Sequence, residues 1–186
     1  MNLIEHMEQT LGPIGGGWSE TLDGRPVAAN VVRFLGTPFA DLVTFTTLGL
    51  SKVVLKLSNG RSVRMELLLS CRERDSSMPI PGVLVTVAGD LISSRVGPDR
   101  GTVLGPAGPL LPDSHLTALY CSVPVFHRKE FRTYSGTDPA TVFVQLIPIS
   151  DDEVSMVDKS GWSVFEDHLE RADVDVFDLS RPSSLV

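Results

Sequence analysis

The sequence has few of the residues that form metal sites and disulfide frameworks. Its four histidines are scattered, and its two cysteines, Cys71 and Cys121, lie far apart in apolar surroundings. Structural zinc sites and small disulfide scaffolds bring such residues together at short, regular spacings. We therefore expect no metal and no cofactor. For the cysteines the composition favours buried thiols that stay reduced, with a disulfide as the alternative.

Long apolar runs and clusters of basic residues are also absent. Glycine, proline or a charged residue interrupts each apolar run before the roughly 20 residues that a membrane-spanning helix needs. The first residues, MNLIEHMEQTLG, carry two glutamates and no basic cluster, which argues against a signal peptide. These features predict a cytoplasmic protein with no membrane segment. The 186 residues suffice for one domain with a sizeable core.

Positive charge is scarce near the C-terminal end. The segment 150–178 holds ten acidic and two basic residues, so it carries −8 while the rest of the chain sums to +1. Such a segment repels phosphate backbones, which argues against nucleic acid as a partner, and it speeds the encounter with a basic protein. The alternative is a solvated helix face that only aids solubility. The residues that we expect to contact a basic partner are Asp151, Asp152, Glu166, Asp167 and Glu170.

Apolar periodicity and turn residues predict the secondary structure. Helices are expected at 1–11, at 79–94, after the capping box formed by Ser150 and Glu153, and at 162–171. Strands are expected at 31–35, 42–47, 53–57, 63–69, within 116–125, at 141–149 and once in the C-terminal stretch 173–186. The Gly-rich stretch 12–17 is expected to be a flexible break, and 95–114 a loop. This order predicts an α+β fold with a mixed, mostly antiparallel β-sheet flanked by helices.

The stretch TTLGLSK (46–52) places a glycine inside an apolar string. A serine nucleophile at Ser51 would need the pattern G-x-S-x-G at a strand-to-helix turn, but Val53 stands in place of the last glycine. We therefore expect Gly49 to permit a close backbone approach, with Leu50 in the core.

Glu66 lies among bulky apolar residues in the strand VRMELLL. Its carboxylate is expected to be buried, with Arg64 or Arg181 as the partner in a structural ion pair. The alternative is an enzyme that uses Glu66 or the C-terminal aspartates, since Asp173 and Asp175 match the D-x-D start of a phosphoryl-transfer motif. Too few residues follow Asp175 to complete that motif, so we expect no catalytic residue.

Several strings occur together in a characteristic order: TLGLS (47–51), RMELLL (64–69), the apolar helix from residue 79, GTVLG (101–105), the apolar strand 142–149, and DLSR (178–181). In this order the sequence resembles the suppressor-of-fused domain family, and its short bacterial members in particular. The resemblance covers residues 28–183 and leaves 1–27 as an N-terminal helix and Gly-rich linker. It implies a structural role for the signature residues Gly49, Leu50, Ser51, Glu66, Pro148, Asp178 and Arg181.

The resemblance also implies a function. Animal members are non-enzymatic and clamp an extended peptide as an added strand, while bacterial relatives are associated with polymorphic toxin systems as immunity proteins. We expect a non-enzymatic immunity protein that neutralises a toxin by stoichiometric binding, with a regulatory module that holds a protein segment by strand addition as the alternative. In this sequence Asp90 or Leu91 replaces a tyrosine of the animal peptide site, and Pro106 replaces an acid. The oligomeric state stays open.

Overall fold

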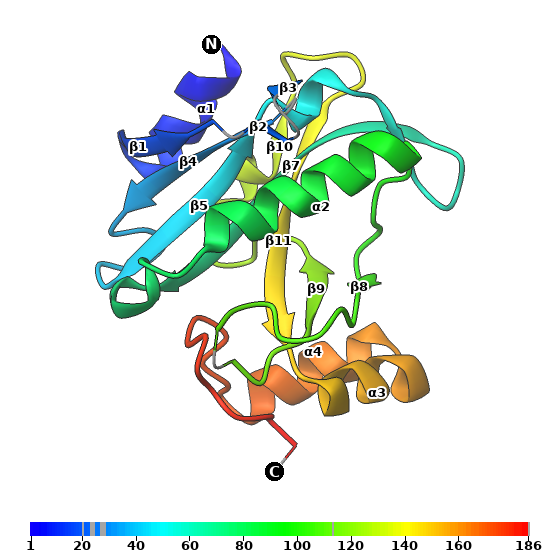
Figure 1. Cartoon of the computed structure of the whole chain (residues 1–186). Helices are drawn as coiled ribbons and strands as arrows, with labels where there is room; N and C mark the ends of the chain where they lie inside the picture. The colour runs from blue at the N-terminus through cyan, green and yellow to red at the C-terminus, as the bar shows by residue number, and fades with distance from the viewer. Residues whose placement is uncertain (20, 23–24, 27–28, 113, 186) are drawn as a thin grey trace.

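The structure, a computed structural model, describes every residue except 20, 23–24, 27–28, 113 and 186 (Figure 1). A nine-stranded sheet runs in the order β1–β4–β5–β7–β11–β9–β8, with β6 paired to β7 and β10 to β11. Its strands are β1 (Ile14–Trp18), β4 (Asn30–Leu35), β5 (Leu42–Leu48), β6 (Leu55–Lys56), β7 (Ser62–Arg72), β8 (Val103–Leu104), β9 (Ala118–Ser122), β10 (Thr133–Tyr134) and β11 (Thr141–Ile149). The short strands β2 (Thr21–Leu22) and β3 (Arg25–Pro26) pair separately.

The strands of the large sheet pair antiparallel, except that β7 and β11 run parallel. The sheet is therefore mixed and mostly antiparallel, and the expected α+β fold class is confirmed. As predicted, the nearly continuous apolar strand β11 is central: it pairs with β7 on one side and with β9 and β10 on the other.

Helices flank the sheet on both faces. They are α1 (Leu3–Leu11), α2 (Ile80–Ser94), α3 (Asp151–Ser160) and α4 (Trp162–Arg171), with the short 3₁₀ helices η1 (Leu50–Lys52), η2 (Glu73–Asp75) and η3 (Lys129–Arg132). Helix α2 crosses one face, α1 lies beside β1, and α3 and α4 lie at the end of the sheet farthest from the N-terminus (Figure 1). The predicted capping box is present, because the Ser150 hydroxyl accepts from the amide of Glu153 and the Glu153 carboxylate accepts from the amide of Ser150.

Successive side chains of β11 pack into different hydrophobic clusters of the core. Val144 and Leu146 join the cluster under α2, whereas Phe143 packs with α1 and η3, and Ile147 packs with α4. Because successive strand side chains point to opposite faces, one apolar strand supplies all three clusters. Cys71 and Cys121 are buried, free thiols in the cluster under α2, and burial raises the pKa of each to about 12.

The prediction of a flexible break at 12–17 is wrong, because Ile14–Trp18 forms the edge strand β1. Its register places Gly16 opposite Arg33 and Trp18 opposite Val31. A Cβ at Gly16 would come within 3.1 Å of the Arg33 side chain, whose guanidinium lies over the Trp18 ring. Gly16 therefore leaves room for the Arg33 side chain. Because glycine has a low strand propensity, the sequence did not indicate a strand here. The domain division after residue 27 stays a prediction.

The strand predicted near the C-terminus is also wrong. Residues 172–185 contain no strand, although Val176, Phe177 and Leu179 are buried. The alternating aspartates and apolar residues resemble a strand, but the carboxylates of Asp175 and Asp178 bind arginine side chains instead of standing at a sheet surface.

Candidate functional site

The TTLGLS stretch wraps around the carboxylate of Glu66. Glu66 Oε1 accepts hydrogen bonds from the amide of Gly49 (2.9 Å) and from the amide and hydroxyl of Ser51 (3.2 and 2.7 Å). Its Oε2 accepts from the hydroxyl of Thr47 (2.6 Å). Gly49 reaches this arrangement at φ 122°, which favours glycine, and Leu50 beside it is fully buried. The serine hydroxyl is thus turned inward to a carboxylate.

The predicted ion pair of Glu66 with Arg64 or Arg181 is wrong. Arg64 donates to the carbonyl groups of Ser51 and Lys52, and Arg181 binds another glutamate. Glu66 is fully buried, and burial raises its pKa although the four hydrogen bonds act in the opposite direction. Hydroxyl and amide donors therefore replace the cation that the sequence led us to expect.

A second buried cluster ties the C-terminal segment to β11 and α3. Arg181 donates two parallel hydrogen bonds to Glu153, of 2.7 and 2.9 Å, and a third to the carbonyl of Pro148 (3.0 Å). Glu153 is fully buried and Arg181 is 5% exposed. Burial alone would raise the pKa of Glu153, but the hydrogen bonds from Arg181 and Ser184 and the charge of Arg181 outweigh it, so the pKa is lowered.

The structure therefore places the signature residues in separate groups. Gly49, Ser51 and Glu66 form the first cluster, and Pro148 and Arg181 belong to the second. Leu50 lies in the core, and Asp178 pairs with Arg74 at the surface. Their structural role stays a prediction.

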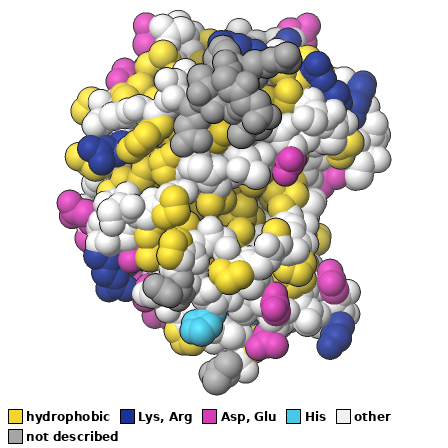
Figure 2. Space-filling view, viewed as in Figure 1, with side chains coloured by type: hydrophobic (Ala, Val, Ile, Leu, Met, Phe, Trp, Pro, Cys, Tyr) yellow, Lys and Arg dark blue, Asp and Glu magenta, His cyan; other side chains and the backbone are white. Residues whose placement is uncertain are grey.

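Much of the negative charge of segment 150–178 is neutralised locally. Four of its ten acids form ion pairs with arginines outside the segment: Glu153 with Arg181, Glu166 with Arg100, Asp175 with Arg72, and Asp178 with Arg74. The six other acids are exposed, against two bases in the segment. On the face drawn in Figure 2, the acidic side chains near α3 and α4 form separate spots with a basic one beside them. The charge is thus more dispersed than the composition suggests.

Of the five predicted partner-binding acids, two line the same groove and three lie outside its lining. Asp151 and Asp152 lie exposed at the start of α3, and Asp167 lies exposed on α4. Glu166 and Glu170 line a groove. Whether these acids contact a partner stays a prediction, but the geometry separates the pair at the groove from the others.

This groove, which we call the α4 groove, lies between α4, the C-terminal segment 173–176 and the loop after β9. It has a volume of about 460 Å³. Its apolar lining consists of Val125, Phe126, Ile147, Leu169, Val174 and Val176, and its polar lining of Arg100, Ser122, Glu166, Glu170 and Asp173. Val125 and Phe126 are 48% and 40% exposed, which is unusual for large apolar side chains at adjacent positions. The groove is therefore an apolar surface with an acidic rim.

One side of the groove is held by a dense polar network around Glu166. Its carboxylate accepts from the hydroxyls of Tyr120 (2.8 Å) and Ser122 (3.1 Å) and from two nitrogens of Arg100. The Arg100 guanidinium also lies 4.5 Å from the centre of the Trp162 ring. Burial raises the pKa of Glu166, but these donors outweigh it and lower the pKa. Glu166 is thus a fixed, compensated charge.

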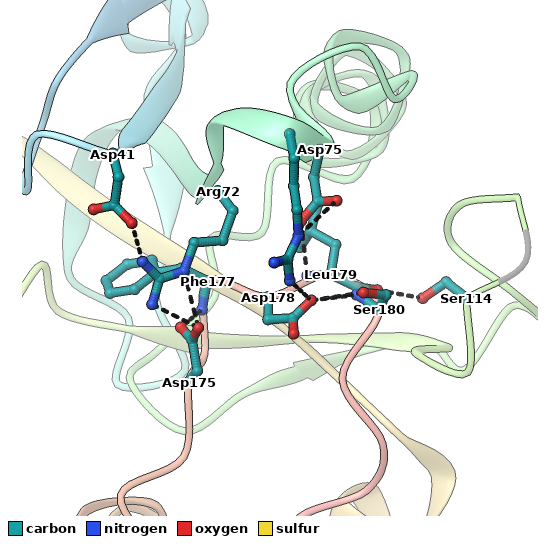
Figure 3. Close-up of polar contacts among 10 residues, drawn as sticks. Asp41, Arg72, Asp75, Ser114, Asp175, Phe177, Asp178, Leu179 and Ser180 are labelled. Carbon is teal, nitrogen blue, oxygen red and sulfur yellow. Dashed lines mark hydrogen bonds and ion pairs between the residues drawn. The ribbon is translucent and has the colours of Figure 1, made fainter.

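Ion pairs fix the C-terminal wall of the groove to the end of β7 and to η2 (Figure 3). Arg72 binds Asp175 through two nitrogens, at 2.9 and 2.7 Å, and also pairs with Asp41. Arg74 pairs with Asp178 at 3.0 Å.

Backbone contacts complete this attachment. The carboxylate of Asp75 accepts from the amide of Leu179, and the hydroxyl of Ser114 donates to the carbonyl of Leu179 (Figure 3). The wall of the groove is therefore preorganised by contacts on both sides of the segment.

Aromatic side chains extend the apolar surface beyond the groove. The Phe126 ring lies 4.8 Å from that of Phe177 and 6.3 Å from that of Phe39, which is 52% exposed. This cluster could not be predicted from the sequence, because residues 39, 126 and 177 belong to three loops that only the folded chain brings together.

Other site types find little support among the residues that the structure describes. No group of three or more His, Cys, Asp or Glu side chains there could hold a metal ion. Within the same residues, no helix is both long and apolar enough to cross a membrane.

Comparison with known proteins identifies relatives along nearly the whole chain. The family model described as suppressor of fused protein (SUFU) matches residues 25–182. The protein named immunity protein YqcF from Bacillus subtilis (strain 168) is 22% identical over 178 residues, which cover 93% of this chain and 92% of that protein.

Solved structures share the fold. A putative SUFU homologue from Neisseria gonorrhoeae FA 1090 has a TM-score of 0.73 at 16% identity, covering 97% of this chain and 93% of that one. The Sufu–Fu complex matches with a TM-score of 0.73 at 14% identity, covering 98% and 91%. Drosophila Suppressor of Fused matches with a TM-score of 0.64 at 13% identity, covering 84% of this chain but 43% of that one.

Proposed function

Because the chain belongs to the suppressor of fused family, we propose that it is a cytoplasmic immunity protein, a non-enzymatic binding module that neutralises a toxin by stoichiometric association. The observation that carries this proposal is the end-to-end similarity to a protein named as an immunity protein. Both chains are covered almost completely, so the likeness concerns the whole molecule rather than one motif.

The contacts of the ionisable groups favour binding over an enzyme. Glu66 is enclosed by the TTLGLS stretch, and Asp175 and Asp178 are held in ion pairs with Arg72 and Arg74. A general acid or base must reach a substrate proton within hydrogen-bond distance. Glu66 lies wholly out of reach of such a substrate, whereas the α4 groove offers exposed apolar side chains of the kind that stabilise protein complexes.

Co-expression with the neighbouring reading frames tests this proposal. Each reading frame beside the gene for this chain is induced in a bacterial host, alone and together with the chain, and growth is followed. We expect one neighbour to stop growth alone and to be tolerated with this chain, and the two proteins to elute as a single complex of fixed stoichiometry. Rescue by amounts of this chain far below those of the toxin would indicate turnover and would overturn the proposal.

Strand addition is the second candidate, supported by the short edge strand β8. Among the described strands, β8 pairs only with β9, so its other edge is open to an incoming strand. A hollow of about 420 Å³, lined in part by Leu91, Val96 and Leu104, adjoins this edge. Backbone hydrogen bonds depend little on salt, whereas steering by charge weakens as salt screens it. An association rate that stays constant between low and high salt would favour strand addition over the acidic surface.

A further inference from the structure

The α4 groove combines two features. It has an apolar floor with exposed side chains, and it has carboxylates at its rim. From this combination we infer that the groove is the docking site for a basic, partly apolar segment of the partner protein, with an apolar side chain against Phe126 and a lysine or arginine at Glu170 and Asp173. This inference rests on the proposed binding function and names the site through which it acts.

Charge complementarity identifies the occupant. Among the described residues, the groove lining has one basic side chain, Arg100, and Glu166 already neutralises it. Glu170 and Asp173 are exposed and, within the described part of the chain, form no ion pair. The groove therefore carries two uncompensated negative charges beside apolar surface. An acidic or purely polar segment would leave either these charges or the apolar floor without a favourable contact.

The apolar floor supplies the affinity. Phe126 is 40% exposed and is supported from behind by Phe177, at 4.8 Å between ring centres. An aromatic side chain that is fixed by its neighbours loses little conformational entropy on binding, and such residues dominate the energetics of interfaces. Because Asp175 and Asp178 fix the wall that carries Phe177, the groove is formed before a partner arrives.

Asp173 offers a variant that separates binding from folding. It adopts φ 50° just after α4, a position where glycine is the usual residue. Asp173→Gly therefore removes the carboxylate and relieves the backbone at the same time. We expect this variant to be at least as stable as the parent while it binds the partner less well, a combination that a purely structural role of Asp173 does not produce.

The experiment uses fluorescent peptides and the full chain. A peptide of alternating lysine and leucine is the probe, with a lysine–serine peptide and a glutamate–leucine peptide as comparisons, and binding is followed by fluorescence anisotropy. We expect only the lysine–leucine peptide to bind measurably. Backbone amide shifts on its addition should concentrate in residues 122–126 and 166–176.

Matched variants distinguish local contacts from overall charge. Glu170→Gln/Asp173→Asn and the control Glu130→Gln/Asp158→Asn remove the same charge from exposed side chains, but only the first pair lines the groove. We expect the first to weaken binding by roughly 5- to 20-fold and the control by less than about 2-fold.

A second matched pair tests the apolar contact. Val125→Ser and Val164→Ser change the same residue type at 48% and 40% exposure, and Val164 lies on α4 outside the groove lining. Val125→Ser should weaken binding by about 5-fold or more, and Val164→Ser should not.

The outcomes separate this inference from the proposed function. If the chain neutralises its toxin but the groove and control variants behave alike, the toxin binds elsewhere and the inference is wrong. If the groove binds the basic peptide but no neighbouring reading frame encodes a toxin, the groove assignment stands and the immunity function fails. Equal binding of all three peptides would also overturn the inference, because it would indicate adhesion without complementarity.

Discussion

Replacing Arg181 with methionine removes the positive half of a buried ion pair. Glu153 is fully buried and receives two hydrogen bonds from Arg181, at 2.7 and 2.9 Å. In the Arg181→Met variant its carboxylate keeps only the amides of Ser150 and Ser184, at 2.8 and 3.1 Å. The carbonyl of Pro148 also loses a donor. The variant therefore buries a charge without a counter-ion.

The expected cost is large relative to the stability of a domain. Removing one partner of a buried ion pair costs about 3–5 kcal/mol. The free energy of unfolding of a domain is about 5–15 kcal/mol, so this loss is roughly a third to a half of a mid-range stability. In a chain of this length 1 kcal/mol corresponds to roughly 2–4 °C, so Tm should fall by roughly 6–20 °C. The double variant Glu153→Gln/Arg181→Met removes the uncompensated charge and should recover about half of the loss or more.

Urea unfolding followed by circular dichroism at neutral pH measures these differences. Arg171→Met is the matched control, because Arg171 is exposed on α4 and donates only to the carbonyl of Asp167 among the described contacts. The control should lie within about 0.5 kcal/mol of the parent. A loss below about 1 kcal/mol for Arg181→Met, or a double variant as unstable as the single one, would refute the reasoning.

Three further predictions concern stability. Glu66→Gln mimics the protonated carboxyl that the raised pKa favours, so the stability of this variant relative to the parent should improve as pH rises above about 4.5. Glu66→Ala should lower the free energy of unfolding by about 3 kcal/mol or more, because it leaves four hydrogen-bond donors unsatisfied. The lowered pKa of Glu153 contributes stability above about pH 4.5, and this contribution disappears as the pH falls through the pKa of Glu153 in the folded protein. On acid titration, Glu153→Gln should therefore lose less free energy of unfolding than the parent. Gly101→Ala should cost about 2 kcal/mol, measured by thermal unfolding, because residue 101 has φ 91° and a Cβ would lie 2.6 Å from Trp162; an unchanged Tm would contradict this.

Local signals in the sequence predicted most elements. The capping box of Ser150 and Glu153 located the start of α3, and the apolar run 141–149 identified the central strand, because both depend on neighbouring residues. The glycines of β1 led to a wrong prediction of a flexible break, because their strand conformation depends on pairing with β4 and on the space that Arg33 occupies.

Sequence reasoning failed where contacts join distant residues. Burial of Glu66 was predicted correctly, but its partners were not, because four hydrogen-bond donors within residues 47–51 replace a single cation. The arginines that neutralise the acidic segment can lie far away along the chain: 103 residues separate Arg72 from Asp175. Composition therefore overestimated the free charge, and it gave no sign of the groove in which the remaining charges matter.

The parallel pairing of β7 with β11 has a consequence for the order of folding. Short connections join strands β4, β5 and β7. By contrast, Arg64 of β7 lies opposite Thr141 of β11, and more than seventy residues separate the two along the chain. Contacts between such distant segments form slowly. We therefore expect β4, β5 and β7 to pair early, in an intermediate that leaves the edge of β7 facing β11 unpaired. Such an unpaired edge favours aggregation at high expression. Hydrogen exchange during refolding would reveal the intermediate.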